Sequence, residues 1–331
     1  MNKAYFLISG LKKLSTELRG DENIYLGIRP YGFHAGNALT LLVYPYLLCK
    51  EFEKTKKVAR FNFFLFINDW EQDRLSGPDM LKYPYNIYPQ STTFQYTPHP
   101  FDKTKNIVDY WEPKIFKEIS LLRKHFNLVK INTIRNSSLK NNKRFKYCLL
   151  KTLKEPQVIA KILKRHTKRP LLKKPLAYAL AVCPYCKSTR GHTSVDKNLI
   201  NHNCFNCNKF FVNNYEIFDY WFYHKPLAIP RIDIFNIDVC ITGFEHFKEG
   251  DYLVRKALMK EFKSVITNLK TLYTPTIFSY NGRIMGKSNG NTTKIPMLKL
   301  LKVAVQYPKS NKLELSSIIN RNFHEGSNIF F

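Results

Sequence analysis

The stretch from Asn23 to Ile67 constrains the fold more than any other part of the chain. It begins with a short apolar run, NIYLGI, which is rich in strand-forming residues and is broken by Arg29-Pro30-Tyr31-Gly32. A helical pattern follows from Leu39 to about Lys56, with a kink expected at Pro45. Arg60–Ile67 is then a nearly continuous apolar strand, as in a sheet covered on both faces. This order predicts a βαβ unit and therefore a parallel sheet.

A second α/β piece lies near the other end of the chain. Ile237–Gly243 has the pattern of a strand, Asp251–Phe262 that of a helix, and Thr276–Tyr280 that of a last short strand before the Asn281-Gly282 turn. If both pieces belong to one sheet, the turns after their strands share the edge at which such folds bind ligands. The fold class predicted is therefore α/β.

A long intervening segment separates the two pieces, with helical patterns at Ile107–Phe126 and Gln157–Arg165. We expect four regions: a first half of the α/β domain (1–100), an insertion (101–225) with a cysteine-rich part at 180–212, a second half (226–291) and a short extension (292–331).

Positive charge is concentrated in the intervening segment. The chain has 53 Lys and Arg against 25 Asp and Glu, a net charge of +28. Asp102–Pro175 alone holds 21 basic and five acidic residues, a net charge of +16. A polyanion such as tRNA or another RNA would neutralise this charge through counterion release. An anionic membrane, an acidic protein, or a general bias toward Lys and Asn are the alternatives.

The chain is expected to be soluble and cytoplasmic, without membrane attachment. Its longest strongly apolar stretch, Ala38–Cys49, is about half of what a membrane span needs. No signal peptide is apparent, because only a short apolar run separates Lys3 from Lys12. The 44% hydrophobic residues are ample for a packed core.

Two C-x2-C pairs form the most specific single motif. Cys183, Cys186, Cys204 and Cys207 give two knuckles separated by 17 residues, a gap that fits a β-hairpin. Each knuckle directs two thiolates toward one tetrahedral ion, so we predict a structural Cys₄ zinc ribbon. Disulfides and an iron–sulfur cluster are the alternatives. Three further cysteines, Cys49, Cys148 and Cys240, have apolar surroundings typical of core residues.

The turn after the first predicted strand has the composition of a phosphate site. Gly32 and Gly36 allow the backbone to approach a phosphate, and the helix that follows offers its N-terminus to anions. His34 can donate to charge developing on an α-phosphate, and Asn37 can hydrogen-bond ATP at the same place. A tight turn with a surface histidine is the alternative.

A glycine-rich basic loop, Gly282–Asn291, follows the last predicted strand. Gly286 and Gly290 give mobility, and Lys287 next to Ser288 can neutralise β- and γ-phosphate charge. The alternative is a flexible basic hairpin.

Together these segments resemble a known family. His34-Ala35-Gly36-Asn37 resembles the HIGH-type motif of class I aminoacyl-tRNA synthetases, and Ile284-Met285-Gly286-Lys287-Ser288 resembles their KMSKS-type loop. Gly243-Phe244-Glu245-His246 resembles the Gly-x-Asp-His segment of class I lysyl-tRNA synthetases. Pro226–Asp233 resembles their Leu-Pro-Trp-Arg-x-Asp-Trp stretch without its tryptophans. The chain thus looks like a class I lysyl-tRNA synthetase catalytic domain that lacks the anticodon-binding domain.

The resemblance implies a Rossmann-like nucleotidyl-transfer (HUP) fold that uses ATP, Mg²⁺, an amino acid and tRNA. It implies catalytic roles for His34, Asn37, Lys287 and Ser288. It places ATP at Gly32, Gly36, Gly243, Glu245, His246 and Met285, and the amino acid at Tyr31 and Asp69. For Asp69, a helix N-cap is an equally good interpretation.

Departures from the family pattern leave three hypotheses open. Ile284 replaces a lysine, Glu245 replaces an aspartate and Asn68 weakens an acidic pair. The first hypothesis is a truncated enzyme that forms an aminoacyl-adenylate, with lysine or a lysine-like amino acid favoured. The second is a true tRNA-charging enzyme, and the third is a non-enzymatic tRNA- or RNA-binding paralogue.

Overall fold

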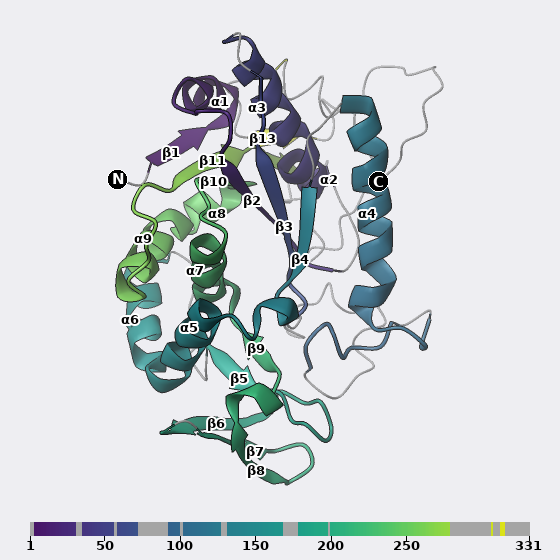
Figure 1. Ribbon diagram of the computed structural model, residues 1–331, viewed down its shortest axis with the longest axis vertical. Coiled ribbons are helices and arrows are strands. Elements are labelled where there is room, and N and C mark those ends of the chain that lie inside the picture. Colours follow the sequence, from purple (N-terminus) through teal and green to yellow (C-terminus); the bar gives the residue numbers. More distant parts are fainter. Residues whose placement is uncertain are drawn as a thin grey trace.

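A computed structural model describes residues 3–30, 35–55, 58–71, 92–99, 102–126, 131–167, 178–197, 199–278, 306 and 312–314. Six parallel strands form its central sheet (Figure 1). Across the sheet they are β1 (Lys3–Phe6), β11 (Lys270–Thr274), β10 (Val239–Gly243), β2 (Asn23–Ile28), β3 (Asn62–Ile67) and β4 (Ile131–Arg135). The predicted α/β class with a parallel sheet is confirmed.

The strand order reverses between β2 and β10. From β2 the chain continues outward through β3 to β4, whereas from β10 it continues through β11 in the opposite direction. Such a reversal is the topological switch point of a doubly wound sheet, where ligands bind beyond the carboxyl ends of the strands. We call these ends, with the residues directly after β2, β3, β10 and β11, the switch-point edge.

Helices cover both faces of the sheet. One core contains side chains of α1 (Leu7–Thr16), of the π-helical turn η1 (Leu39–Val43), of α3 (Tyr44–Glu53) and of α4 (Ile107–Phe126). The opposite core contains side chains of α5 (Lys143–Lys154), α6 (Pro156–His166), α7 (His224–Ile234) and α9 (Asp251–Glu261). A parallel sheet needs this double cover because neither face can be left to water.

The first βαβ unit forms as the sequence predicts. Phe63 and Leu65 of β3 lie in one core and Phe66 lies in the other, as expected of a strand buried on both sides. The helical segment starts with α2 (Ala35–Ala38) and passes through η1 into α3, in whose first turn Pro45 lies. Proline has no N–H and crowds the carbonyl four residues earlier, so the widened turn η1 takes the place of the expected kink.

Two strands of the sheet come from parts of the chain that gave no strand pattern. β1 is only four residues long, and β4 lies inside the segment predicted to be an insertion. β4 is an edge strand with the polar sequence INTIR, of which only Ile131 is fully buried. An edge strand needs no continuous apolar run, which explains why the pattern did not reveal it. The intervening segment, which contributes no strand to the central sheet, therefore begins only after Arg135.

The cysteine-rich part forms a small β structure that packs on α5 at the lower end of Figure 1, and we call it the four-cysteine module (residues 179–222). β5 (Ala179–Ala181) and β9 (Tyr220–Phe222) pair as an antiparallel stem. Beyond the stem, β6 (Gly191–Asp196), β7 (Leu199–Cys204) and β8 (Phe210–Asn214) form an antiparallel sheet, followed by the short η5 (Tyr215–Ile217). The predicted hairpin between the knuckles is confirmed as β6 and β7.

Beyond β11 the described chain continues with β12 (Thr276–Phe278), which pairs in parallel with β13 (Lys312–Glu314). The predicted KMSKS-type loop, Gly282–Asn291, lies outside the described residues. Within the described parts of the chain, no helix has both the length and the apolar character needed to cross a lipid bilayer.

Candidate functional site

The segments that resemble synthetase motifs converge at the switch-point edge. β2 leads toward α2, which contains Gly36 and Asn37, and the neighbouring β10 leads into α8 (Phe244–Lys248). α2 lies against β12, and the Thr276 hydroxyl of β12 donates a hydrogen bond of 3.1 Å to Glu245 on α8. The described part of the HIGH-type segment, in α2, is therefore linked through β12 to Glu245 of the Gly-x-acid-His segment. Tyr31, Gly32 and His34 lie outside the described residues.

Glu245 is held close to the end of its strand. Its carboxylate folds back over Gly243, where an added Cβ would lie 2.1 Å from Oε1. A side chain at Gly243 would therefore push the carboxylate away. The Glu245 side chain remains one-third exposed.

His246 lies between two acids. Its Nε2 is 3.8 Å from Glu245 Oε1, and its Nδ1 is 3.8 Å from Glu249 Oε2. The imidazole side chain is also more than one-third exposed. The role of His246 in ATP binding stays a prediction.

Asp69 follows β3 and is buried, with its carboxylate directed at a neighbouring turn. One oxygen accepts the Asn136 amide at 2.8 Å, and both oxygens lie 3.3 Å from the Ser137 amide. These amides begin the short 3₁₀ turn η4 (Ser137–Leu139), so the carboxylate acts as its cap. Burial raises the pKa of Asp69, and the Ser137 and Asn136 hydrogen bonds oppose that rise. Asp69 thus caps a turn 67 positions away and is not the N-cap residue of a helix of its own; its role in amino-acid binding stays a prediction.

A second acid, Glu71, was not singled out in the sequence, although it lies only four residues after β3. It is buried and accepts a 2.6 Å hydrogen bond from Arg29, which directly follows β2. His224, the first residue of α7, has Nδ1 3.4 Å from the same oxygen. Burial alone would raise the pKa of Glu71, but Arg29 and His224 outweigh it and hold that pKa far below its usual range. Burial also lowers the pKa of His224 to about 4.

Arg231 of α7 is a fully buried cation at this edge. It donates hydrogen bonds of 2.6 Å to the Tyr25 hydroxyl and to Asn68 Oδ1, and it lies 5.4 Å from the centre of the Phe66 ring. Among the residues that the structure describes, Arg231 has no acidic partner and its Nε has no hydrogen-bond acceptor. Burial of a guanidinium without an acidic partner is costly, so the hydrogen bonds to Tyr25 and Asn68 are needed to offset part of that cost.

A second buried cluster, Asp251 with Lys225 and Arg255, also carries a net positive charge. The carboxylate of Asp251 is shared by Lys225 and by Arg255, the latter at 2.7 Å. Burial would raise the pKa of Asp251, but these two cations dominate and lower it far below its usual range. With two cations on one carboxylate, this part of the edge favours negatively charged ligands.

The residues predicted in the KMSKS-type loop, Met285, Lys287 and Ser288, lie outside the described residues. The described chain stops at Phe278, the last residue of β12 and four residues before that loop begins. Because β12 contacts α2 and Glu245, the described stretch that precedes the loop ends at the switch-point edge. The position of the loop beside the HIGH-type turn stays a prediction.

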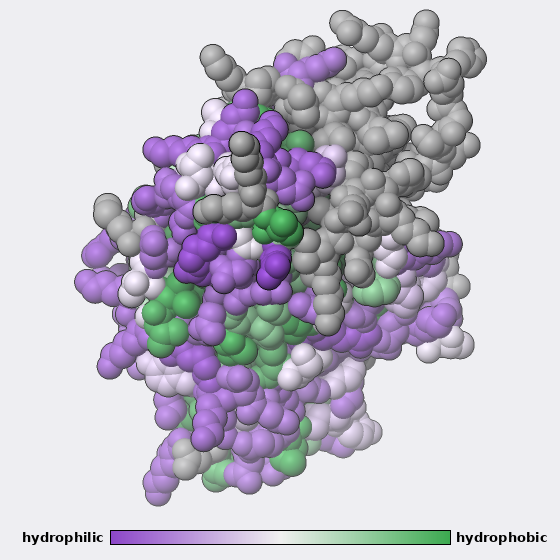
Figure 2. Space-filling model, turned by 45° about the horizontal axis from the view of Figure 1, so that its top comes forward, coloured by the Kyte–Doolittle hydropathy of each residue, from purple (hydrophilic) through white to green (hydrophobic). Residues whose placement is uncertain are grey.

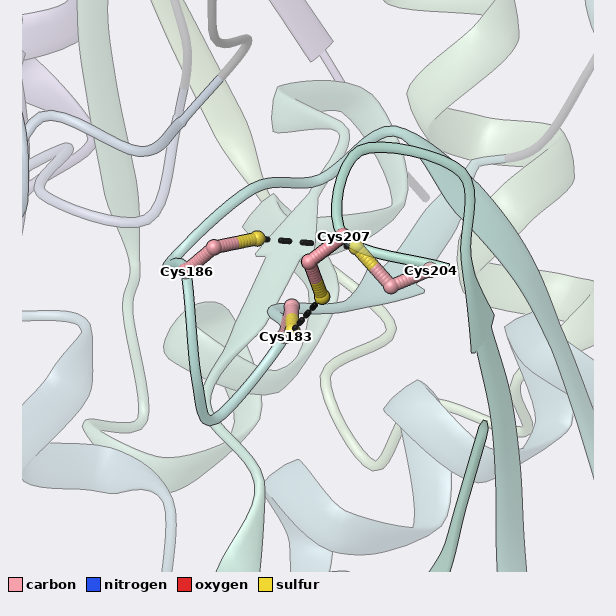
Figure 3. A group of neighbouring side chains, drawn as sticks. All are labelled: Cys183, Cys186, Cys204 and Cys207. Atoms are coloured by element: carbon pink, nitrogen blue, oxygen red, sulfur yellow. Dashed lines mark hydrogen bonds between the residues drawn. The ribbon is translucent and has the colours of Figure 1, made fainter. Parts of the chain in front are cut away.

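The four predicted cysteine ligands come together in the module. Figure 3 shows their side chains directed toward one another from two knuckles. The Sγ atoms of Cys183 and Cys207 are 3.7 Å apart, and those of Cys186 and Cys204 are 3.6 Å apart. Sulfurs on the edges of a tetrahedral Zn–S₄ centre are about 3.8 Å apart, given Zn–S bonds of about 2.3 Å. The cluster fits a zinc ion with no open coordination position, which suits a structural rather than a catalytic site.

Some cations of the basic segment form ion pairs with acidic residues of the chain itself. Arg135 pairs with Glu112 and Asp109, and Lys146 pairs with Glu216. Lys105 pairs with Asp102. Other cations of the segment are exposed and remain available to a polyanion: Lys103, Lys117, Lys143, Lys154, Lys161, Lys164 and Arg165. Binding of RNA by this segment stays a prediction.

No protein-family model and no curated protein matches the chain. Among solved structures, it is similar to a tyrosyl-tRNA synthetase complexed with L-tyrosine from Archaeoglobus fulgidus, with a TM-score of 0.41 and 12% identity over 86% of this chain and 64% of that one. It is also similar to a Campylobacter jejuni protein described as an arginyl-tRNA synthetase, with a TM-score of 0.33 and 13% identity over 93% of this chain and 70% of that one. The chain thus spans less than two thirds of the tyrosyl enzyme. Similarity at this level leaves the family and the substrate of this chain unassigned.

Proposed function

We propose that this protein activates an amino acid with ATP, forming an aminoacyl-adenylate, and transfers it to tRNA or to another acceptor. In the activating step a carboxylate oxygen of the amino acid attacks the α-phosphorus of ATP. The bond from that phosphorus to the bridging oxygen breaks, and pyrophosphate leaves. The enzyme would thus be a ligase of the class I aminoacyl-tRNA synthetase type.

One observation carries the proposal. The segments that resemble the HIGH-type motif and the Gly-x-acid-His motif follow the two strands at which the sheet order reverses, and β12 links them through the Thr276–Glu245 hydrogen bond. The same β12 leads toward the KMSKS-type loop. The described residues of two motifs more than 200 positions apart, in α2 and α8, thus lie near β12 at the edge where an α/β sheet binds a nucleotide, which supports the proposal.

Each predicted residue has a role in this chemistry. Gly32 and Gly36 would let the backbone approach the α-phosphate, which His34 and Asn37 would contact by hydrogen bonds. On the β10 side, Glu245 would accept the ribose hydroxyls, with Gly243 and His246 beside it. Across the nucleotide, Lys287 would neutralise the departing pyrophosphate, with Ser288 and Met285 in the same loop.

The identity of the amino acid is open to experiment. The family resemblance favours lysine, with Tyr31 and Asp69 predicted as contacts. The charges at the edge do not favour a cationic side chain, because Glu71 is paired with Arg29 and Arg231 has no acidic partner among the described residues. Every amino acid therefore has to be screened.

Two metal ions are proposed with different roles. Cys183, Cys186, Cys204 and Cys207 would hold a structural Zn²⁺ that fixes the two knuckles. Mg²⁺ would arrive bound to the phosphates of ATP, since this ion keeps much of its water and favours phosphate oxygens. The acceptor proposed is tRNA, bound by the exposed cations of the basic segment.

Pyrophosphate exchange into ATP tests the site assignment. We expect His34→Ala and Lys287→Ala each to lower the exchange rate at least about 100-fold, as for loss of a group that stabilises a charged transition state. Lys256→Ala is the matched control, because Lys256 is an exposed lysine of α9 away from the edge. Exchange at the wild-type rate in both site variants would refute the assignment.

A further inference from the structure

One face of the β6–β7–β8 sheet in the four-cysteine module is turned to solvent. Residues directly opposite one another on paired strands share a face. Asn203 of β7 lies opposite His192 on one side and Phe210 on the other, and Asn201 lies opposite Val212. The alternate residues of β7, which are Ile200, His202 and Cys204, are completely buried on the other face.

The exposed face is aromatic at its knuckle end. Phe210 is 64% exposed, and Phe205 and Tyr185 of the two knuckles are 61% and 66% exposed. Lys209, which follows the second knuckle, lies 3.2 Å from the centre of the Tyr185 ring of the first knuckle. In Figure 2, hydrophobic residues interrupt the hydrophilic surface at the lower end of the molecule, where Figure 1 places the module. Aromatic rings grouped in this way on a surface indicate a binding function.

The surroundings of these rings are basic. Residues 183–214 contain four exposed cations, Lys187, Arg190, Lys197 and Lys209, and a single acid, Asp196. The centre of the face carries uncharged hydrogen-bonding groups such as Asn201 and Asn203. A ligand that fits must present flat rings and negative charge together. Single-stranded nucleic acid does so, because unpaired bases stack on aromatic side chains while lysines neutralise the phosphates. A duplex does not, because its bases are already stacked inside.

We propose that this face, formed by Phe210, His192 and Asn203 on the sheet with Phe205 on the adjoining knuckle, binds unpaired nucleotides of an RNA. Bases stack on Phe210 and Phe205, and Lys209 and Arg190 contact the backbone. The module is a second nucleic-acid surface, separate from the basic segment of residues 102–175. The choice of RNA over DNA rests on the proposed function, whereas the stacking of single strands does not.

Fluorescence anisotropy with a labelled, unstructured 12-nucleotide RNA tests the proposal on the zinc-loaded full chain. We expect Phe210→Ala and Phe205→Ala each to weaken binding about tenfold, since loss of one stacked base by alanine substitution costs roughly 1–3 kcal/mol. Phe210→Trp should retain binding. Ile217→Ala and Leu253→Ala are matched controls at apolar residues that are 58% and 50% exposed, and they should bind like the wild type.

The salt dependence of binding and competition by other nucleic acids distinguish the contribution of base stacking to the affinity from that of phosphate contacts. Phe210→Ala should leave the slope of log affinity against log salt unchanged, whereas Lys209→Ala should reduce it by about 0.7, the value for one single-strand phosphate contact. A 12-base-pair RNA duplex should compete poorly, and a single-stranded DNA of the same sequence should compete less well than the RNA.

Three results would overturn the proposal: wild-type affinity in both alanine variants, preference for the duplex, or wild-type self-association that Phe210→Ala abolishes in sedimentation. Equal zinc content and equal thermal unfolding of the variants exclude loss of folding as the cause. The assay contains neither ATP nor amino acid, so its failure would leave the exchange experiment on the proposed function unaffected.

Discussion

Replacement of Asp69 tests whether its carboxylate stabilises the fold or binds substrate. Its oxygens accept the Asn136 amide at 2.8 Å and the Ser137 amide at 3.3 Å in a fully buried setting. Hydrogen bonds to a charged group contribute about 1.5–3 kcal/mol each, and Asp69→Ala would leave the Asn136 amide with only its 3.4 Å bond to the Ile67 carbonyl and would remove the acceptor of the Ser137 amide. Because release of the buried carboxylate offsets part of this loss, we expect the free energy of unfolding to fall by about 3 kcal/mol. Asp69→Asn keeps one acceptor oxygen and should cost about 1 kcal/mol.

Urea unfolding followed by circular dichroism measures these differences, with pyrophosphate exchange assayed on the same samples. Asp21→Ala is the control, since Asp21 is a largely exposed acid whose loss should change stability by less than about 0.5 kcal/mol. If Asp69→Ala unfolds like the wild type but loses exchange, the carboxylate binds substrate and the capping interpretation is refuted.

Two further predictions follow from buried groups. Burial lowers the pKa of His224 to about 4, so the unfolded chain binds more protons between pH 4 and about 6.5 and the wild type loses stability as the pH falls through that window. Between pH 7 and pH 5 the free energy of unfolding, measured with urea, should fall by about 2 kcal/mol less in His224→Gln than in the wild type. An equal fall in both proteins would show that His224 does not cause the loss of stability. Elemental analysis should find one zinc per chain in the wild type and in Cys49→Ala but none in Cys204→Ser, and a zinc-free wild type would exclude the structural metal site.

Much of the fold could be predicted because its central elements carry strong local patterns. β2 and β3 are short apolar runs bounded by polar turns, and α9 has apolar residues at helical spacing. The cysteine knuckles have a spacing that predicts both the hairpin and the convergence of the four thiols. β4 was missed because an edge strand needs little apolar surface.

The charged groups of the switch-point edge could not be predicted in the same way. Arg29 and Glu71 are 42 positions apart, and Arg231 and Asn68 are 163 positions apart. Their contacts depend on strand order and on the placement of α7 across the sheet, which local patterns do not contain. Glu245 could be found because it directly follows its strand, whereas Arg231 lies in the third turn of a helix.

The exchange of labelled pyrophosphate into ATP by the wild-type protein, measured with each of the twenty amino acids, tests the central claim most directly. We predict exchange that depends on one amino acid or on a few related ones, because formation of the adenylate is reversible and specific. ATP binding without exchange for any amino acid would contradict the proposed activation and would favour a non-enzymatic RNA-binding protein.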